Sequence, residues 1–244
     1  MPKPITVPDR RRISLAIGDG RRSLRSWQDQ VRDPSLTVLL AVELCLVFIA
    51  APLAAQGVAI ARPVVETLVL AVIVVMLSHR RGAIAAILLG LAAVLSSFFF
   101  GTEWPPVAAS VLRRGGNALT FLALTWVVAH AVYAPGRITS RRLQGAAVVY
   151  LNLATIFAAV FSLIWDLNPS AFANVPAPIG GPGELATMLY FSLTTLTTTG
   201  YGDIVPVDPL ARSMANLESI IGQFYLAITV ARLVTLELEH RRRG

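Results

Sequence analysis

Six long, apolar and almost uncharged windows place the strongest constraint on how this chain can fold. A helix needs roughly 20 such residues to cross the hydrocarbon core of a bilayer. Backbone N–H and C=O groups find no water in that core. A helix pairs them with each other by internal hydrogen bonds. We therefore expect an all-α membrane protein with six transmembrane helices. The windows run from about Leu36 to Ala55, from Val64 to Leu77, from Ala83 to Phe100, from Ala118 to Tyr133, from Ala146 to Trp165 and from Leu210 to Leu236.

The composition agrees with a membrane location and argues against most soluble classes. Hydrophobic residues make up 55% of the chain and charged residues 14%. The net charge of +7 is distributed in short clusters beside the apolar windows, which favours a membrane surface over nucleic acid as the partner. The polar start of the chain has no cleavable signal peptide pattern. A single cysteine, Cys45, excludes an intrachain disulfide.

Lysine and arginine are concentrated on one side of the expected membrane. With the N-terminus in the cytoplasm, the outer side holds only Arg62, Arg113, Arg114 and Arg212. Positive residues are retained on the cytoplasmic side, so we expect a multi-pass protein of the cell (inner or plasma) membrane with both termini cytoplasmic. The inner side then holds Lys3, Arg10, Arg11, Arg12, Arg21, Arg22, Arg25, Arg32, Arg80, Arg81, Arg137, Arg141, Arg142, Arg241, Arg242 and Arg243.

A shorter apolar segment, from Glu184 to Leu196, lies between the last two windows. It is helical in period but too short to cross the membrane, which is typical of a re-entrant helix. Non-spanning backbone at this depth must be surrounded by protein or line a wet path. The Pro- and Gly-rich stretch from Asn168 to Gly183 is expected to be an outer loop, and Glu184 suits the first turn of a helix.

The stretch TMLYFSLTTLTTTGYGDIVP, from Thr187 to Pro206, resembles the pore helix and selectivity filter of the potassium channel superfamily. In that family four such loops converge on one axis, where backbone carbonyls replace the hydration shell of the ion. The resemblance implies K+ coordination by the carbonyls of Thr198, Thr199, Gly200 and Tyr201, with the Thr198 hydroxyl completing the innermost site. It also implies a homotetramer, because one chain cannot surround an ion.

The filter residues have a chemical reason for their types. Successive carbonyls can face one axis only if some residues adopt left-handed backbone angles, so glycine is expected at Gly200 and Gly202. Tyr201 then points outward as a spacer.

Several neighbouring positions depart from the commonest pattern of the family. Thr199 stands in place of valine or isoleucine, and Thr194 stands where several relatives carry a carboxylate. Tyr190 and Phe191 replace the usual tryptophan pair; a Tyr190 hydroxyl can still support the filter through Asp203, whereas Phe191 has no donor. These departures bear on filter rigidity more than on selectivity.

The sixth window is expected to be the inner, pore-lining helix. Gly222 stands at the position of the hinge glycine of the family, and close helix packing is an equally good interpretation. Helical spacing predicts that the path is lined by Gly222, Gln223, Leu226, Val230 and Val234, and that the last three form an apolar gate. Glu218 either braces the pore helix or faces the cavity; the sequence leaves both open.

The first four windows are arranged like a voltage sensor but lack its charges. The fourth, from Asn117 to Tyr133, contains neither Lys nor Arg, so we expect weak or absent voltage gating. Arg113 and Arg114 are interpreted as interface anchors at its outer end.

Three other ionisable residues in these windows need an interpretation. Glu43 and Glu66 are expected to pair with polar groups inside the bundle, Glu66 with Arg113 or Arg114. His130 is expected to be packed or hydrated, with a pH-sensing role as the alternative.

These observations divide the chain into five regions. Residues 1–35 form a basic cytoplasmic segment, 36–135 an uncharged peripheral four-helix domain, 136–145 a basic linker, 146–238 the pore domain and 239–244 a basic tail. No regulatory domain is expected after the last window. The linker residues Arg137, Arg141 and Arg142 are candidates for contact with anionic lipid.

The functional hypothesis is a passive, potassium-selective channel that needs no cofactor besides the K+ it conducts. One alternative is a less selective monovalent cation channel, which would differ at Thr199. Another is a potassium transporter subunit or a non-conducting regulatory membrane protein. An enzyme is not expected, because no metal-ligand cluster or nucleophile–base arrangement is evident.

Overall fold

The computed structural model describes residues 36–56, 81–100, 104–133, 140–176 and 183–243, and these are almost entirely helical. The second expected span, from Val64 to Leu77, lies outside the described residues, as do Glu66, Arg137 and the segment 1–35. The first described helix starts at residue 36 and continues through the π-helical turn η1 (Leu46–Ala50) into α2 (Ala51–Ala55). The remaining elements are α4 (Arg81–Phe100), α5 (Pro106–Val132), α6 (Ser140–Leu167), β1 (Phe172–Ala173), α7 (Glu184–Leu196), β2 (Val205–Pro206) and α8 (Pro209–Arg243).

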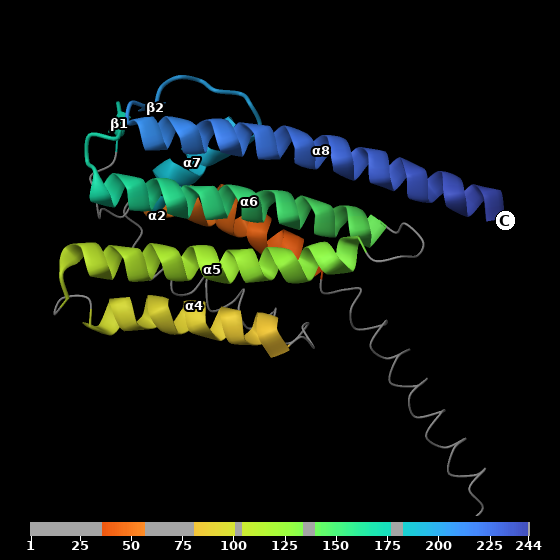
Figure 1. The fold of residues 1–244 in the computed structure, drawn as a ribbon, viewed down its shortest axis with the longest axis horizontal. Coiled ribbons are helices and arrows are strands. Elements are labelled where there is room, and N and C mark those ends of the chain that lie inside the picture. The colour runs from red at the N-terminus through yellow and green to blue at the C-terminus, as the bar shows by residue number, and fades with distance from the viewer. Residues whose placement is uncertain (1–35, 57–80, 101–103, 134–139, 177–182, 244) are drawn as a thin grey trace, which may run out of the picture.

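The long helices run side by side, in the order α4, α5, α6 and α8 (Figure 1). Helix α7 is much shorter and lies against both α6 and α8 at the end of the bundle that carries β1 and β2 (Figure 1). Within the described part, three helical segments are long and apolar enough to cross a membrane: Leu36–Leu53, Arg142–Leu167 and Pro209–Arg232. They coincide with the first, fifth and sixth windows of the sequence, so the chain is a helical membrane protein.

Three predicted boundaries were wrong, because a search for uncharged windows stops at every arginine. Helix α5 begins twelve residues early, at Pro106, where the fixed φ of proline suits a first turn. Helix α6 begins at Ser140, so the second half of the expected linker 136–145 is helical and includes Arg141 and Arg142. The expected tail 239–244 continues α8 as far as Arg243. Arginine is a good helix former, so these charged residues extend the helices and do not end them.

A short strand pair between the loop before α7 and the segment after the expected filter was not predicted. Strand β1 pairs antiparallel with β2, placing Phe172 opposite Pro206 and Ala173 opposite Val205. Asn174, with φ of 61°, then turns the chain away. The amide of Val207 adds a hydrogen bond of 2.9 Å to the carbonyl of Ala171. This pairing fastens the loop before α7 to the segment that follows the expected filter.

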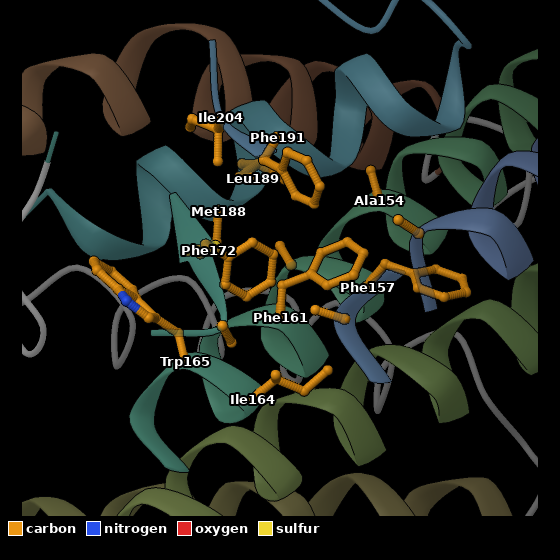
Figure 2. Close-up of a cluster of buried hydrophobic side chains, with 14 of the residues drawn as sticks. Ala154, Phe157, Phe161, Ile164, Trp165, Phe172, Met188, Leu189, Phe191 and Ile204 are labelled. Atoms are coloured by element: carbon orange, nitrogen blue, oxygen red, sulfur yellow. The ribbon is translucent and has the colours of Figure 1, made fainter. Parts of the chain in front are cut away.

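Two hydrophobic cores share helix α6. One is formed with the first helix, α4 and α5 around the early turns of α6. The other joins the later turns of α6 to α7, β1 and α8. Its centre is a triangle of Phe161, Phe172 and Phe191, whose rings meet edge to face with centroids 5.0–5.9 Å apart (Figure 2). These three rings come from α6, β1 and α7, so they hold α7 against its neighbours.

Helices α4 and α5 approach each other closely at Gly116. A Cβ atom added there would lie 2.8 Å from the carbonyl oxygen of Gly90 and 3.0 Å from the Cβ of Ala93. Gly115, the preceding residue, has open space around it. Small residues at such a crossing let two membrane helices pack backbone to backbone.

Replacing Gly116 by alanine is therefore expected to lower the free energy of unfolding by about 1–3 kcal/mol, because the added methyl group pushes α4 from α5. Gly115→Ala is the matched control and is expected to be neutral or stabilising by up to about 1 kcal/mol, since alanine favours helix. Unfolding of the purified protein in detergent measures both. Equal effects of the two substitutions would contradict the close crossing.

Candidate functional site

The segment after α7 has an unusual backbone. Residues Thr198, Gly200 and Gly202 have positive φ values of 58°, 53° and 77°. In an extended strand successive residues face opposite sides, and a left-handed residue at every second position reverses that alternation. The backbone thus takes the left-handed turns expected at both glycines. Thr198 was not expected among them, since a left-handed β-branched residue is strained and needs surrounding structure to hold it.

The end of α7 anchors this backbone through its last carbonyls. The carbonyl of Thr194 accepts the amides of Thr199, at 2.8 Å, and of Gly200, at 3.1 Å. The carbonyl of Thr195 accepts the amide of Thr198 at 2.9 Å. Because the amides are used on the α7 side, the carbonyls of this segment are left for another partner. Thr194 thus supports the segment through its backbone.

Side chains around Thr198 add further contacts. The Thr198 hydroxyl donates to the carbonyl of Thr197 at 2.7 Å, and the amide group of Gln223 in α8 reaches this hydroxyl at 3.4 Å. The hydroxyls of Thr197 and Thr199 lie 2.9 Å apart. The valine or isoleucine usual at position 199 in the family has no hydroxyl for this contact.

Tyr190 and Asp203 connect α7 to the outer end of the segment. The Tyr190 hydroxyl donates to Asp203 Oδ2 at 2.7 Å, which is the contact that the sequence allowed. The rings of Tyr190 and Tyr201 are stacked, with an interplanar angle of 4°. Hydrogen bonding from Tyr190 lowers the pKa of Asp203 below its ordinary value and raises that of the Tyr190 phenol. Phe191 instead points into the phenylalanine triangle (Figure 2).

Four polar contacts hold the second half of α7 to α6 and α8. Glu218, fully buried, meets the hydroxyl of Ser192, which also reaches the carbonyl of Ala154 at 2.8 Å. Tyr150 of α6 donates to the carbonyl of Leu196 at 3.2 Å, and Ser219 of α8 donates to that of Thr195 at 3.2 Å. The side chain of Glu218 therefore braces α7, the first of its two interpretations.

The inner helix α8 presents one buried and one exposed face. Gly222 is buried, and a Cβ atom there would overlap the carbonyl oxygen of Leu196 and lie 2.9 Å from Leu196 Cδ1. Its place among the path-lining residues was therefore wrong: close approach to α7 requires the glycine. The other predicted lining residues are exposed on the single chain: Gln223, Leu226, Val230 and Val234.

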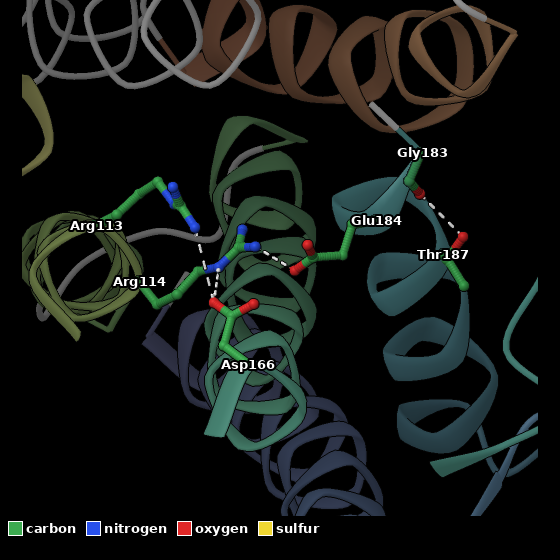
Figure 3. Close-up of polar contacts among 6 residues, drawn as sticks. All are labelled: Arg113, Arg114, Asp166, Gly183, Glu184 and Thr187. Carbon is green, nitrogen blue, oxygen red and sulfur yellow. Dashed lines mark hydrogen bonds and ion pairs between the residues drawn. The ribbon is translucent and has the colours of Figure 1, made fainter. Parts of the chain in front are cut away.

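Arg114 contradicts its interpretation as an interface anchor. Its guanidinium is buried between two carboxylates, with Nε 3.2 Å from Asp166 Oδ2 and Nη2 bound to Glu184 Oε1 (Figure 3). Arg113 is 37% exposed and approaches Asp166 at 3.7 Å. The sequence search missed Asp166 and this role of Arg114, because the partners are separated by 52 and 70 residues.

Glu43 and His130 are the remaining ionisable residues of the predicted windows that the structure describes. Glu43 is buried, yet neither of its carboxylate oxygens has a hydrogen-bond partner among the described residues, so its expected pairing is not observed there. His130 is exposed, with Nδ1 3.0 Å from the carbonyl of Trp126. No group of three or more His, Cys, Asp or Glu side chains suited to a metal occurs in the described part of the chain.

Comparison with known proteins assigns this region to a family. Residues 146–238 match the family described as "Ion channel". The chain is 36% identical over 83 residues to the inward rectifier potassium channel Kirbac3.1 of Paramagnetospirillum magnetotacticum, covering 34% of this chain and 25% of the relative. It is 30% identical over 79 residues to the potassium voltage-gated channel protein shk-1 of Caenorhabditis elegans, covering 32% and 15%. No solved structure matches.

Residues 146–238 are thus similar to ion channels, and both of these relatives are named as potassium channels. The chain spans a quarter or less of the length of these two relatives. The resemblance noted in the filter sequence is thus confirmed at the level of the family.

Tyr190→Phe is expected to move the pKa of Asp203 upward, toward its ordinary value, because the hydrogen bond that favours the carboxylate is lost. A lowered native pKa stabilises the fold above the ordinary carboxyl pKa, and this stabilisation is lost as pH falls through the lowered pKa. The parent should therefore lose this contribution to stability on acidification, whereas the variant, which lacks it already at neutral pH, should show a weaker dependence of stability on pH. NMR titration of the Asp203 carboxyl measures the change.

The matched control is Tyr201→Phe, which removes a hydroxyl that makes no hydrogen bond to the described residues. It should leave the pKa of Asp203 in place. An unchanged Asp203 pKa in Tyr190→Phe would show that the hydrogen bond is not maintained in solution.

Gly222→Ala separates the two interpretations of this glycine. Close packing predicts a loss of about 1–3 kcal/mol of stability, because the methyl group overlaps the Leu196 carbonyl. A pure hinge predicts unchanged stability and slower opening. Thermal unfolding in detergent, measured beside single-channel recording, distinguishes them; we expect the loss of stability.

Proposed function

We propose that this chain is the subunit of a homotetrameric, potassium-selective channel that conducts K+ passively down its electrochemical gradient. The observation that carries the proposal is the segment Thr198–Gly202, where left-handed residues alternate and the amides of its first three residues bond to α7. Carbonyls left free in this way are what a dehydrated K+ ion requires. The ion-binding groups are the carbonyls of Thr198, Thr199, Gly200 and Tyr201, with the Thr198 hydroxyl innermost.

Four copies are required because a single segment offers oxygens from one side only. The exposed apolar face of α8 supports such an assembly, since large hydrophobic side chains such as Phe224, Ile228 and Val230 are 59–62% exposed on the single chain. In the tetramer we place Gln223, Leu226, Val230 and Val234 on the path, with the last three forming an apolar gate.

The rest of the proposed architecture follows the charge distribution. Six spans, one of them near residues 64–77, would leave both termini in the cytoplasm. The protein would then lie in the inner or plasma membrane of the cell. The basic residues Arg137, Arg141 and Arg142 would face anionic lipid there. No Lys or Arg follows Arg114 in α5, which supports weak or absent voltage dependence.

The deciding experiment is ion flux from liposomes that contain the purified protein. We expect K+ to move faster than Na+ or Cs+. Gly200→Ala is expected to lose most of this flux, because a left-handed alanine costs about 1–2 kcal/mol in each subunit.

Each outcome has a defined meaning. Equal flux of all three ions would favour a less selective cation channel, in which the Thr199 substitution alters the filter. Absence of flux at any voltage would overturn conduction and favour a transporter subunit or a non-conducting regulatory protein.

A further inference from the structure

Arg114 joins three helices by a single guanidinium group. It lies in the first third of α5 and contacts Asp166, in the last turn of α6, and Glu184, the first residue of α7 (Figure 3). All three side chains are buried, with exposures of 9%, 5% and 2%. A buried ion cluster of this kind is strongly disturbed when one member is removed, because the others remain charged and unpaired.

The two contacts of Arg114 use the fixed geometry of its guanidinium group. Nε binds the carboxylate from α6, whereas Nη2 binds the carboxylate from α7. These nitrogens are held in one rigid plane, so the distance between the two carboxylates is set by the fork itself. A lysine ammonium is a point charge on a flexible stem and cannot set that distance.

The first turn of α7 carries one charged residue, the buried Glu184. A loop separates α6 from α7, and the residue before the helix, Gly183, provides no side-chain cap. The hydroxyl of Thr187 bonds back to the carbonyl of Gly183, within the same turn (Figure 3). Arg114 supplies a charged contact that relates the first turn of α7 to helices α5 and α6.

The other end of α7 holds the filter. The helix is 13 residues long, which makes it a rigid rod of about 20 Å. Its last carbonyls, those of Thr194 and Thr195, accept the amides of three consecutive filter residues. A shift at Glu184 is therefore transmitted along the rod to the backbone of Thr198, Thr199 and Gly200.

We propose that Arg114 is a positioning residue for the ion filter, through which the peripheral helix α5 sets the place of the pore helix α7. This inference rests on the proposed function, because it requires the filter to bind K+. The inference also assigns Arg114 a static role. Because Arg114 is bound to two carboxylates of the pore segment, it is a fixed link, or tie, between α5 and that segment and not a mobile gating charge. Arg113 is 37% exposed and lies farther from Asp166, at 3.7 Å, so it is dispensable for the tie.

The test measures K+ binding through the thermal stability of the detergent-solubilised assembly. A ligand that binds the native state stabilises that state, so bound K+ should protect the assembly against heat. Four proteins are compared: the parent, Arg113→Met, Arg114→Lys, and the neutral triple variant Arg114→Met with Asp166→Asn and Glu184→Gln. The triple variant removes the tie without leaving a buried charge from this cluster. Decay of K+ current during sustained opening, recorded in planar bilayers, is the second readout.

We expect the triple variant to require at least roughly five-fold more K+ for half-maximal protection, the lower end of ordinary coupling between sites, and to lose current faster. Arg114→Lys should fall between it and the parent, and Arg113→Met should resemble the parent. A triple variant that assembles and matches the parent in both readouts overturns the inference. If the triple variant does not assemble, an unchanged K+ requirement in Arg114→Lys overturns it instead.

Failure of the proposed function gives a different result. In that case the parent itself shows no protection by K+ compared with Na+ and passes no K+ current. A parent that responds to K+ while the tie variants do not differ from it would leave the channel proposal intact and remove only the role of Arg114.

Discussion

The hydrogen bonds between the last carbonyls of α7 and the amides of Thr198, Thr199 and Gly200 are the constraint on which the rest of the pore segment depends. Irregular backbone at membrane depth is stable only if its polar groups find partners. The amides find theirs on α7, so the position of this helix decides where the carbonyls of the segment lie. The contacts around α7 therefore fix the position of this helix.

These contacts come from helices α5, α6 and α8 and from β1, and they differ in their chemistry. The phenylalanine triangle holds the helix by apolar packing against α6 and β1. Glu218 and Ser219 of α8 hold its second half by polar contacts. Arg114 holds its first turn by charge. Tyr190, on α7 itself, reaches forward to Asp203 and fastens the outer end of the segment. The tryptophan pair usual in the family is absent, and these other contacts brace the segment.

The sequence predicted most of the local structure. The bounds of α7, Glu184–Leu196, were predicted correctly, because a short apolar helical run between turn residues is a local signal. The left-handed backbone at Gly200 and Gly202 was expected from the conformational freedom of glycine. Predictions failed where a distant partner decides the structure. Arg114 was interpreted as a surface anchor because neither Asp166 nor Glu184 lies near it in sequence, and the left-handed conformation of Thr198 has no local signal.

The sequence by itself determined that the chain is a helical membrane protein, where its long apolar helices lie and which segment resembles a selectivity filter. Each of these follows from composition or spacing along the chain, which act over one or two helical turns. Only the tertiary structure decided that Gly222 packs on Leu196, that Glu218 meets Ser192 and that Arg114 bridges α6 and α7. The physical reason is burial: a charge or a glycine is placed by the groups that surround it, and those groups come from other helices.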